Sequence, residues 1–280
     1  MHSNARTPNN PGVGKVAGMA RAIVSGHTQG LGAAIAAELM ARGIAVLGLA
    51  RRASPTLAAR FPGLLREEAI DLADSAALAA WLDGAALRDF LADAGLVLLV
   101  NNAGMLQPVG ALQQQDPMAL AQAVALNVTA PLMLAAALAK HRAGVDARAA
   151  FAGSAERAGP VAGAPAQLRI LHVSSGAARN AYAGWSVYCA SKAALDHHAR
   201  TVAQDAVEGV RICSLAPGVI DTDMQALIRA TPADRFPARE RFAALHRDGR
   251  LMAPQAAAER VVDYLLSPAF GDKPVDDVRA

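Results

Sequence analysis

The fold of this chain is decided by the stretch Ala22-Ile23-Val24-Ser25-Gly26-His27-Thr28-Gln29-Gly30-Leu31-Gly32. Its first four residues predict a short apolar strand. An apolar-periodic helix is expected to follow from Ala33 to Arg42, with Gly43 at the position of a C-cap glycine. A strand, glycine turn and helix in this order bring backbone N–H groups to a nucleotide pyrophosphate. The spacing is G-x-x-x-G-x-G rather than G-x-G-x-x-G, so the turn alone fits a tight strand-to-helix connection equally well.

Apolar strands alternate with helical patterns across the chain, and no linker interrupts them. The predicted fold is therefore an α/β fold, a doubly wound parallel sheet of Rossmann type, in a single domain over residues 19–280. Hydrophobic residues make up 53% of the chain and aromatic ones only 4%, which predicts a core of Ala, Leu and Val. Residues 1–18 are expected to be a disordered extension, and residues 143–167 an irregular surface insertion.

A second informative pattern combines Ser175 with Tyr188 and Lys192. Tyr188 and Lys192 are four residues apart, so on a helix they share one face. Ser175 follows an apolar run, residues 168–173, that predicts a buried strand. A free tyrosine has a pKa near ~10, and a neighbouring ammonium is expected to lower that pKa toward neutrality. The three groups together are suited to moving a proton on and off a carbinol oxygen.

Taken in order, these motifs resemble those of the short-chain dehydrogenase/reductase family. The resemblance covers roughly residues 20–268 and implies a Rossmann-type reductase with a nicotinamide cofactor. The segments around Tyr188 and Pro217, and the C-terminal tail, are most similar to sepiapterin reductases and bacterial benzil-type diketone reductases; that tail lacks the family's usual Gly-rich final strand. The motifs that carry the resemblance are Ser25-Gly26-x-x-x-Gly30-x-Gly32, Asn101-Asn102-Ala103-Gly104, Asn127, Ser175, Tyr188-x-x-x-Lys192 and Pro217-Gly218.

The cofactor implied by the resemblance is NADP(H) rather than NAD(H). Arg51 and Arg52 follow the predicted strand 44–50, and no Asp or Glu occurs between Gly43 and Arg66. An arginine there suits a ribose 2′-phosphate, whereas NAD is usually held by an acidic residue; the alternative is a solvated charge pair. The full set of expected cofactor residues is Gly26, His27, Gly30, Leu31, Gly32, Arg51, Arg52, Asp71, Asn102, Ala103, Gly104, Tyr188, Lys192, Pro217, Gly218, Ile220 and Thr222.

Some of these positions also have ordinary structural interpretations. His27 could contact a phosphate, but many residues are tolerated at its position. By resemblance Asp71 contacts the adenine edge, although a helix-capping role for Asp71 is nearly as well supported and Asp74 competes for it. From the residues alone, Asn102 and its neighbours form only a turn after the apolar strand 96–100.

By resemblance, the catalytic residues are Asn127, Ser175, Tyr188 and Lys192. Tyr188 would donate the proton and Ser175 would bind the carbonyl oxygen, while Lys192 would lower the tyrosine pKa and hold the ribose. Asn127 would hold a water in the proton relay, although a buried Asn is more often satisfied structurally.

Expected substrate contacts are Ser175, Tyr188, Trp185 and Asp276, under a lid formed by residues 220–250. In sepiapterin reductase an acidic residue near the C-terminus anchors the pterin. Asp276 is the nearest match after a one-residue gap, and a solvated C-terminal Asp is an equally good interpretation. The substrate implied is a small ketone or vicinal dicarbonyl.

Charge, cysteine content and hydrophobic patterning restrict the classes of partner expected for this protein. The net charge is +3 and no Lys/Arg cluster exceeds the Arg51-Arg52 pair, which argues against nucleic acid. Cys189 and Cys213 lack metal-ligand spacing, so no metal is expected, and reduced thiols favour a cytoplasmic setting. Residues 117–139 carry no charge, but Gln122 and other polar groups argue against a membrane span. A helix packed on the sheet and on a partner subunit fits better, so a homodimer or homotetramer is expected.

Two other functions remain open from the sequence. One is a different enzyme of the same fold, such as a 3-oxoacyl-thioester reductase or another alcohol dehydrogenase. The other is a non-catalytic NADP-binding regulator. A regulator has no need of a complete Ser, Tyr, Lys and Asn set, so the sequence favours the reductase.

Overall fold

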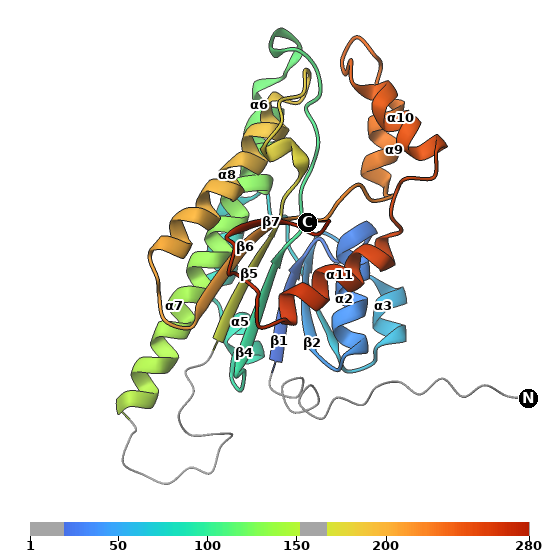
Figure 1. Cartoon of the computed structure of the whole chain (residues 1–280). Coiled ribbons are helices and arrows are strands. Elements are labelled where there is room, and N and C mark those ends of the chain that lie inside the picture. Colours follow the sequence, from blue (N-terminus) through green and yellow to red (C-terminus); the bar gives the residue numbers. More distant parts are fainter. Residues whose placement is uncertain (1–19, 152–166, 280) are drawn as a thin grey trace, which may run out of the picture.

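Seven parallel strands form one sheet in the order β3-β2-β1-β4-β5-β6-β7 in the computed structural model (Figure 1). The structure describes residues 20–151 and 167–279. The chain reverses direction across the sheet between β1 and β4, which is where doubly wound folds open a crevice. The strands are β1 (Ala20–Ser25), β2 (Ala45–Ala50), β3 (Leu65–Ala69), β4 (Leu96–Asn101), β5 (Gln167–Val173), β6 (Val210–Ala216) and β7 (Val275–Asp277).

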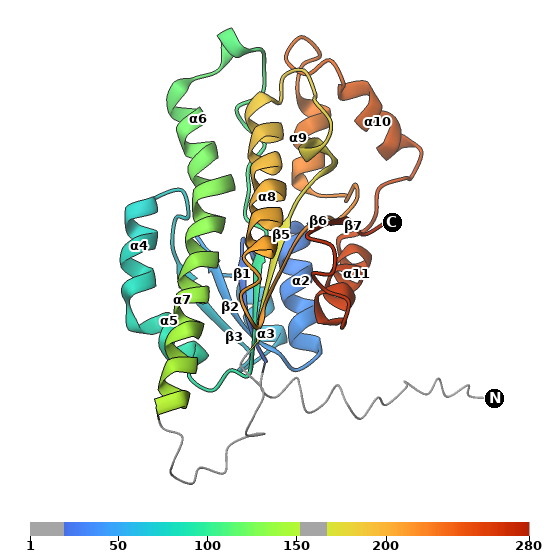
Figure 2. The same ribbon diagram turned by 60° about the vertical axis from the view of Figure 1, so that its left-hand side comes forward.

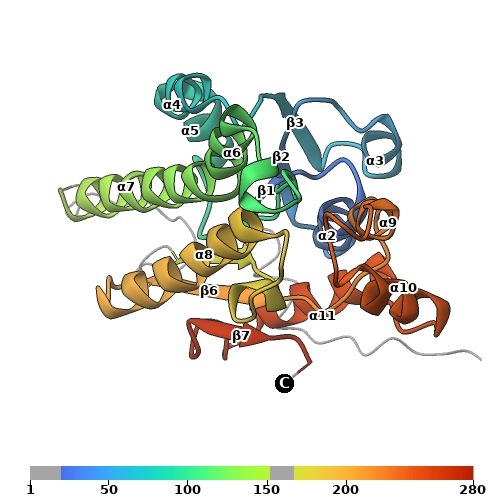
Figure 3. The same cartoon turned by 90° about the horizontal axis from the view of Figure 1, so that it is seen from above.

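Helices cover both faces of this sheet, as the view from above shows (Figure 3). They are α2 (Gly30–Ala41), α3 (Pro55–Arg60), α4 (Ser75–Asp83), α5 (Ala85–Leu91), α6 (Pro117–Val124), α7 (Ala130–Phe151), α8 (Ser186–Gln204), α9 (Asp223–Ala230), α10 (Arg239–Arg247) and α11 (Pro254–Leu266). Shorter turns are the 3₁₀ helices η1 (Leu112–Gln114) and η3 (Gly176–Ala178) and the π-helical turn η2 (Ala125–Thr129). The predicted fold class is confirmed.

Burial explains why these residues form these strands. All six residues of β4 are buried, as expected for a central strand with helices on both faces. At one edge, β3 carries Arg66, Glu67 and Glu68, and charged side chains of this kind discourage pairing with further strands. One apolar cluster joins the sheet to α2 and α11, and a second joins it to α4, α5, α7 and α8.

A third apolar cluster lies outside the two sheet cores. It includes Trp185, Tyr188, Phe236 and Phe242, which are all buried. Helices α9 and α10, which belong to the predicted lid segment 220–250, stand above the carboxyl end of the sheet next to the start of α8 (Figures 1 and 2). The lid region is therefore built around a small core of its own.

The uncharged helix expected at 117–139 is longer than predicted. It runs through α6, η2 and α7 to Phe151, so residues 143–151, expected to be irregular, are helical. By length and composition, 117–144 could cross a membrane, a test that core helices of soluble proteins also pass. Within the chain 33% of its most apolar window is buried. One face packs as expected, and most other residues of that window are only partly buried by this chain.

Two expectations concern segments at the limits of the described residues. The predicted disordered extension 1–18 lies outside them, as do residues 152–166 of the predicted insertion. At the other end, the tail was expected to lack the family's usual Gly-rich final strand, and Val275–Asp277 forms a short strand without glycine that pairs in parallel with β6.

Candidate active site

A cleft of about 640 Å³ opens at the carboxyl ends of β1, β4, β5 and β6. It brings together most of the site residues predicted from the sequence, which come from segments up to about 200 positions apart. The predicted residues that line it are Gly26, Gly30, Leu31, Gly32, Arg51, Arg52, Asp71, Asn102, Ala103, Gly104, Ser175, Trp185, Tyr188, Lys192, Pro217, Gly218, Ile220 and Thr222.

The glycine turn is shaped so closely that its glycines admit no side chain. Gly26 has a positive φ of 69°, and a Cβ on Gly32 would lie 2.1 Å from the Gly26 carbonyl oxygen. The Asn102 side chain donates to the carbonyls of Ser25 and Gly26, both at 3.1 Å. In return, Ser25 Oγ accepts from the backbone N–H of Asn102 and Ala103, both at 3.0 Å. The turn after β4 thus clamps the turn after β1 and leaves the α2 N-terminus facing the cleft.

The side chain of His27 points away from this cleft, so its predicted phosphate contact is wrong. Its Nε2 lies 2.6 Å from Glu67 Oε1 and the residue is fully buried. A Cβ on Gly48 would lie 2.5 Å from the ring, so His27 packs over β2. The reason is tertiary: β3 pairs with β2 and brings a carboxylate under the turn.

The rim of the cleft beyond β2 and β3 carries both positively and negatively charged side chains. Arg51 and Arg52 are exposed at the cleft, directly after β2. Asp71 lines the cleft with its Oδ1 bonded to the Ala73 N–H at 3.0 Å. Helix α4 is capped instead by Asp74, which accepts from the N–H groups of Ala76 and Ala77. The capping alternative for Asp71 is therefore excluded.

Tyr188 and Lys192 lie one turn apart on α8, and both are buried. Lys192 Nζ donates to the Val173 carbonyl at 2.7 Å and lies 5.8 Å from the centre of the Tyr188 ring. Ser175 is the second residue after β5 and forms a hydrogen bond with the Tyr188 side chain. The predicted trio is thus assembled at one point of the cleft.

Burial dominates the protonation of the Tyr188 and Lys192 pair. It raises the pKa of Tyr188 to about 12, although the hydrogen bond from Ser175 works in the opposite direction. Burial also lowers the pKa of Lys192 to about 8, opposed by the charge of Asp196. The predicted lowering of the Tyr188 pKa is therefore absent from this structure, because burial disfavours the phenolate.

Asn127 lies in the π-helical turn η2, a kind of turn that is frequent at functional sites. Its side chain accepts from the Met105 N–H and donates to the Met105 carbonyl, both at 2.8 Å. A Cβ on Gly104 would lie 3.3 Å from Asn127 Oδ1 and 3.7 Å from Lys192 Nζ. Asn127 thus holds the loop after β4 and lies near the Lys192 ammonium, although it does not itself line the cleft.

Asp276 does not reach the cleft, which contradicts its predicted substrate contact. In β7 it pairs with Leu215, and its carboxylate accepts from the Asp277 N–H at 2.9 Å. The tail contributes Arg279 instead, which lines the cleft beside Gly218 and is held by Asp277 at 2.6 and 2.8 Å. Sequence offered no signal for Arg279, because its placement depends on the pairing of β7 with β6.

The substrate side of the cleft has an aromatic wall. Trp185 stacks on Phe236 with ring centres 4.2 Å apart and planes inclined by 8°. Tyr182 and Phe242 surround the same indole, at 5.2 and 5.3 Å. Of these, only Trp185 was predicted to contact substrate. Phe236 and Phe242 of the lid segment could have been identified from the sequence, because aromatic residues are rare in this chain.

The sequence matches that of a known family over most of its length. The match to the short chain dehydrogenase family covers residues 20–233. Benzil reductase ((S)-benzoin forming) from Bacillus cereus is 30% identical, over 89% of this chain and 94% of that protein. Sepiapterin reductase from Meriones unguiculatus is 33% identical, over 90% of this chain and 94% of that protein.

Solved structures agree with this assignment. A short-chain dehydrogenase/reductase from Burkholderia vietnamiensis shares 49% identity and a TM-score of 0.64, over 94% of this chain and 98% of that one. A short chain dehydrogenase from Burkholderia cenocepacia in complex with NADP shares 25% identity and a TM-score of 0.68, over 93% and 98%. The fold and the cleft are those of a nucleotide-dependent oxidoreductase. The chain belongs to the short-chain dehydrogenase family and is an enzyme close to the benzil and sepiapterin reductases.

Proposed function

We propose that this enzyme reduces a compact vicinal dicarbonyl with NADPH. The observation that carries the proposal is the convergence of Ser175, Tyr188 and Lys192 in a cleft walled by aromatic rings. The relatives named for benzil and sepiapterin support the substrate class, because both compounds carry a ketone next to a flat conjugated ring. The indole of Trp185 is stacked on another aromatic ring, and a wall of this kind suits flat, apolar substrates.

The residues of the cleft fit a dinucleotide. The clamped glycine turn and the α2 N-terminus would hold its pyrophosphate, and Arg51 with Arg52 would hold a 2′-phosphate. Asp71 and the segments around Asn102 and Pro217 would line the adenosine and nicotinamide ends. When bound, the cofactor supplies the hydride.

Proton transfer would then fall to the chain's own side chains. The Tyr188 hydroxyl donates a proton to the carbonyl oxygen, and Ser175 hydrogen-bonds that oxygen as charge develops on it. Lys192 favours the phenolate that results, and Asn127 holds the water through which the proton is restored. A proton donor with a pKa of about 12 stays protonated at neutral pH and is ready to donate.

We further infer that the enzyme works as a homodimer or homotetramer. Only 33% of the most apolar window in 117–144 is fully buried within one chain, and a second copy is the partner that would complete its burial. Light scattering of the purified protein tests this inference.

An NADPH-consumption assay tests the proposed activity. Benzil, sepiapterin and an acetoacetyl thioester are compared, with wild type and Tyr188→Phe side by side. Turnover of benzil or sepiapterin, lost in Tyr188→Phe while NADPH binding remains, is the expected result. Turnover of the thioester alone would replace the proposal with a 3-oxoacyl-thioester reductase. NADPH binding without turnover of any carbonyl would favour the non-catalytic regulator.

A further inference from the structure

The carboxylate of Asp196 is buried directly behind the active site. The residue is 2% exposed and lies on α8, one helical turn beyond Lys192. Its Oδ1 accepts hydrogen bonds from Ser174 Oγ at 2.6 Å and from Ser214 Oγ at 2.7 Å. Its Oδ2 lies 3.3 Å from Arg179 Nε. These three donors satisfy a carboxylate that is removed from solvent.

These donors connect the elements that carry the catalytic groups. Ser174 precedes Ser175 at the end of β5, and Ser214 lies on β6, which leads into Pro217-Gly218. Asp196 itself shares α8 with Tyr188 and Lys192. One carboxylate therefore fixes the ends of two strands against the helix, and with them the position of Ser175 relative to Tyr188.

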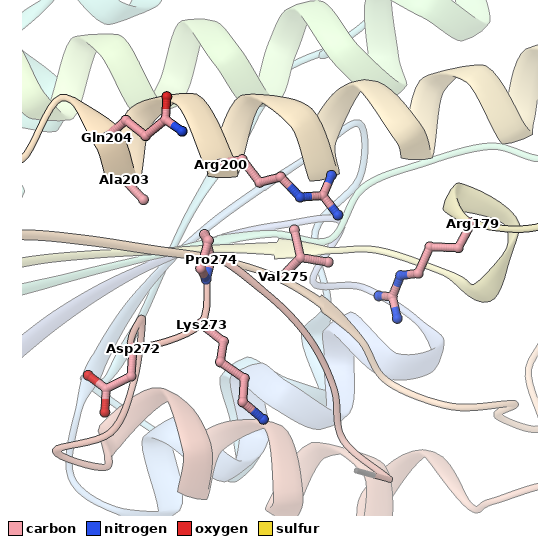
Figure 4. A pocket seen from close by; sticks show the side chains of 8 residues that line it. All are labelled: Arg179, Arg200, Ala203, Gln204, Asp272, Lys273, Pro274 and Val275. Atoms are coloured by element: carbon pink, nitrogen blue, oxygen red, sulfur yellow. The ribbon is translucent and has the colours of Figure 1, made fainter.

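Arg179 extends the connection to the edge of the sheet. Its Nη2 donates to the Asp276 carbonyl of β7 at 3.1 Å. Figure 4 shows its guanidinium reaching from the turn after β5 into the hollow beside Val275 and Lys273. The side chain is 36% exposed, so the charge that balances Asp196 sits at the protein surface and can be removed without opening the core.

The charge of Asp196 acts on Lys192. Burial lowers the pKa of Lys192, and the Asp196 charge raises it. The other titratable groups around the pair are Tyr188 on α8, His172 on β5 and Cys213 on β6. Burial lowers the pKa of His172 to about 3 and raises that of Cys213 to about 11, so both are neutral near pH 8. Asp196, balanced by Arg179, is therefore the charge that sets the state of Lys192.

We propose that Asp196 is a positioning residue of this active site: its buried carboxylate aligns Ser175 with Tyr188 through Ser174 and Ser214, and its negative charge keeps Lys192 an ammonium. The proposal rests on the proposed reductase function only for the activity readout. It assigns to Asp196 no contact with substrate or cofactor.

Three variants separate the charge from the alignment. Asp196→Asn removes the charge and keeps an oxygen that can accept from both serines. Ser174→Ala removes one hydrogen bond and keeps the charge. Arg179→Gln removes the balancing positive charge at a partly exposed position. The negative charge of Asp196 then acts on Lys192 without Arg179 to offset it. Each is assayed for kcat/KM with NADPH and benzil, and for the NADPH Kd by fluorescence, across about pH 6–10.

The alkaline limb of these profiles reports the loss of the Lys192 proton. In Asp196→Asn the limb moves to lower pH by roughly half to one unit, and in Arg179→Gln it moves to higher pH. In Ser174→Ala the limb stays in place while the plateau of kcat/KM falls about tenfold, because misplacing a reacting group is costly. A merely structural Asp196 would lower the plateau in every variant and move no limb.

Limbs that stay at the wild-type pH in both charge variants, or that move in the same direction, would overturn the proposal. If Asp196→Asn does not fold, the contrast between Arg179→Gln and Ser174→Ala still decides. If wild type turns over no carbonyl compound, the proposed function fails, while the pH dependence of the NADPH Kd still tests Asp196 independently.

Discussion

Replacing Gly32 with alanine should break the cofactor side of the cleft. The new Cβ would lie 2.1 Å from the Gly26 carbonyl oxygen and 2.3 Å from Asn102 Nδ2. Cβ contacts under 3.0 Å are essentially never found, so the two turns must separate by at least 0.9 Å (3.0 − 2.1 Å). The groups that must move are the Gly26 backbone and the Asn102 side-chain amide, which makes two hydrogen bonds. Neither group can swing aside as a flexible side chain would.

The cost follows from what is displaced. Overpacking of this kind costs about 1–3 kcal/mol. The two hydrogen bonds from Asn102 to Ser25 and Gly26 are weakened as well, at roughly 0.5–1.5 kcal/mol each. Gly32→Ala should therefore lose about 2–6 kcal/mol of unfolding free energy, which corresponds to a fall in Tm of roughly 4–24 °C. Affinity for NADPH should fall at least about tenfold, because the same turn would hold the pyrophosphate.

Gly144→Ala is the matched control. Gly144 is exposed in α7, and a Cβ there meets nothing within 4 Å. The same substitution in an open helix should raise stability by about 0.5–1 kcal/mol and leave NADPH binding unchanged. Thermal unfolding and fluorescence titration of both variants give the comparison. A Gly32→Ala protein with wild-type Tm and wild-type NADPH affinity would refute the steric reasoning.

Three further changes test other parts of the site. Arg51→Ala should reduce the ratio of kcat/KM for NADPH to that for NADH by about tenfold to a hundredfold, because one charge-assisted phosphate contact is lost; an unchanged ratio would remove Arg51 from the cofactor site. Asp276→Ala should leave kcat/KM for benzil and sepiapterin within about twofold of wild type, since Asp276 pairs in β7 away from the cleft; a selective loss with sepiapterin would restore the pterin contact. Lys192→Met should raise the urea midpoint at pH 7, because burial lowers the pKa of Lys192 from 10.5 to about 8 and so makes its charged form destabilising. Between pH 8 and 10.5 the folded wild type releases this proton while the unfolded chain keeps it, so wild type gains stability and the advantage of the variant shrinks; a lower midpoint at pH 7 would contradict this.

The sequence predicts best those features that are set by local periodicity. Tyr188 and Lys192 share a helix face because they are four residues apart, and the glycine turn follows from its own spacing. The parallel sheet and the position of the cleft at its carboxyl ends follow from the alternation of strands and helices. These features need no knowledge of which distant residues meet.

The errors occur where a side chain's partner comes from another strand. His27 turns from the cleft because Glu67 on β3 meets it, and Asp276 is held away because β7 pairs with β6 in a particular register. Shifting that register by one residue would exchange the faces on which Asp276 and Asp277 lie. Asp196 was missed for the same reason, since its partners lie on β5 and β6 and the turn after β5.

The pKa of Tyr188 links the substrate wall to the chemistry. Tyr188 belongs to the same buried cluster as Trp185, Phe236 and Phe242, and this cluster shares no buried residue with the two sheet cores. Burial is the main cause of the high Tyr188 pKa, and the Trp185 ring stands edge-on to the tyrosine at 5.6 Å. Widening the wall for a larger substrate would therefore hydrate the Tyr188 hydroxyl and lower its pKa while leaving the sheet intact. The aromatic side chains that form this wall are thus the ones that bury Tyr188.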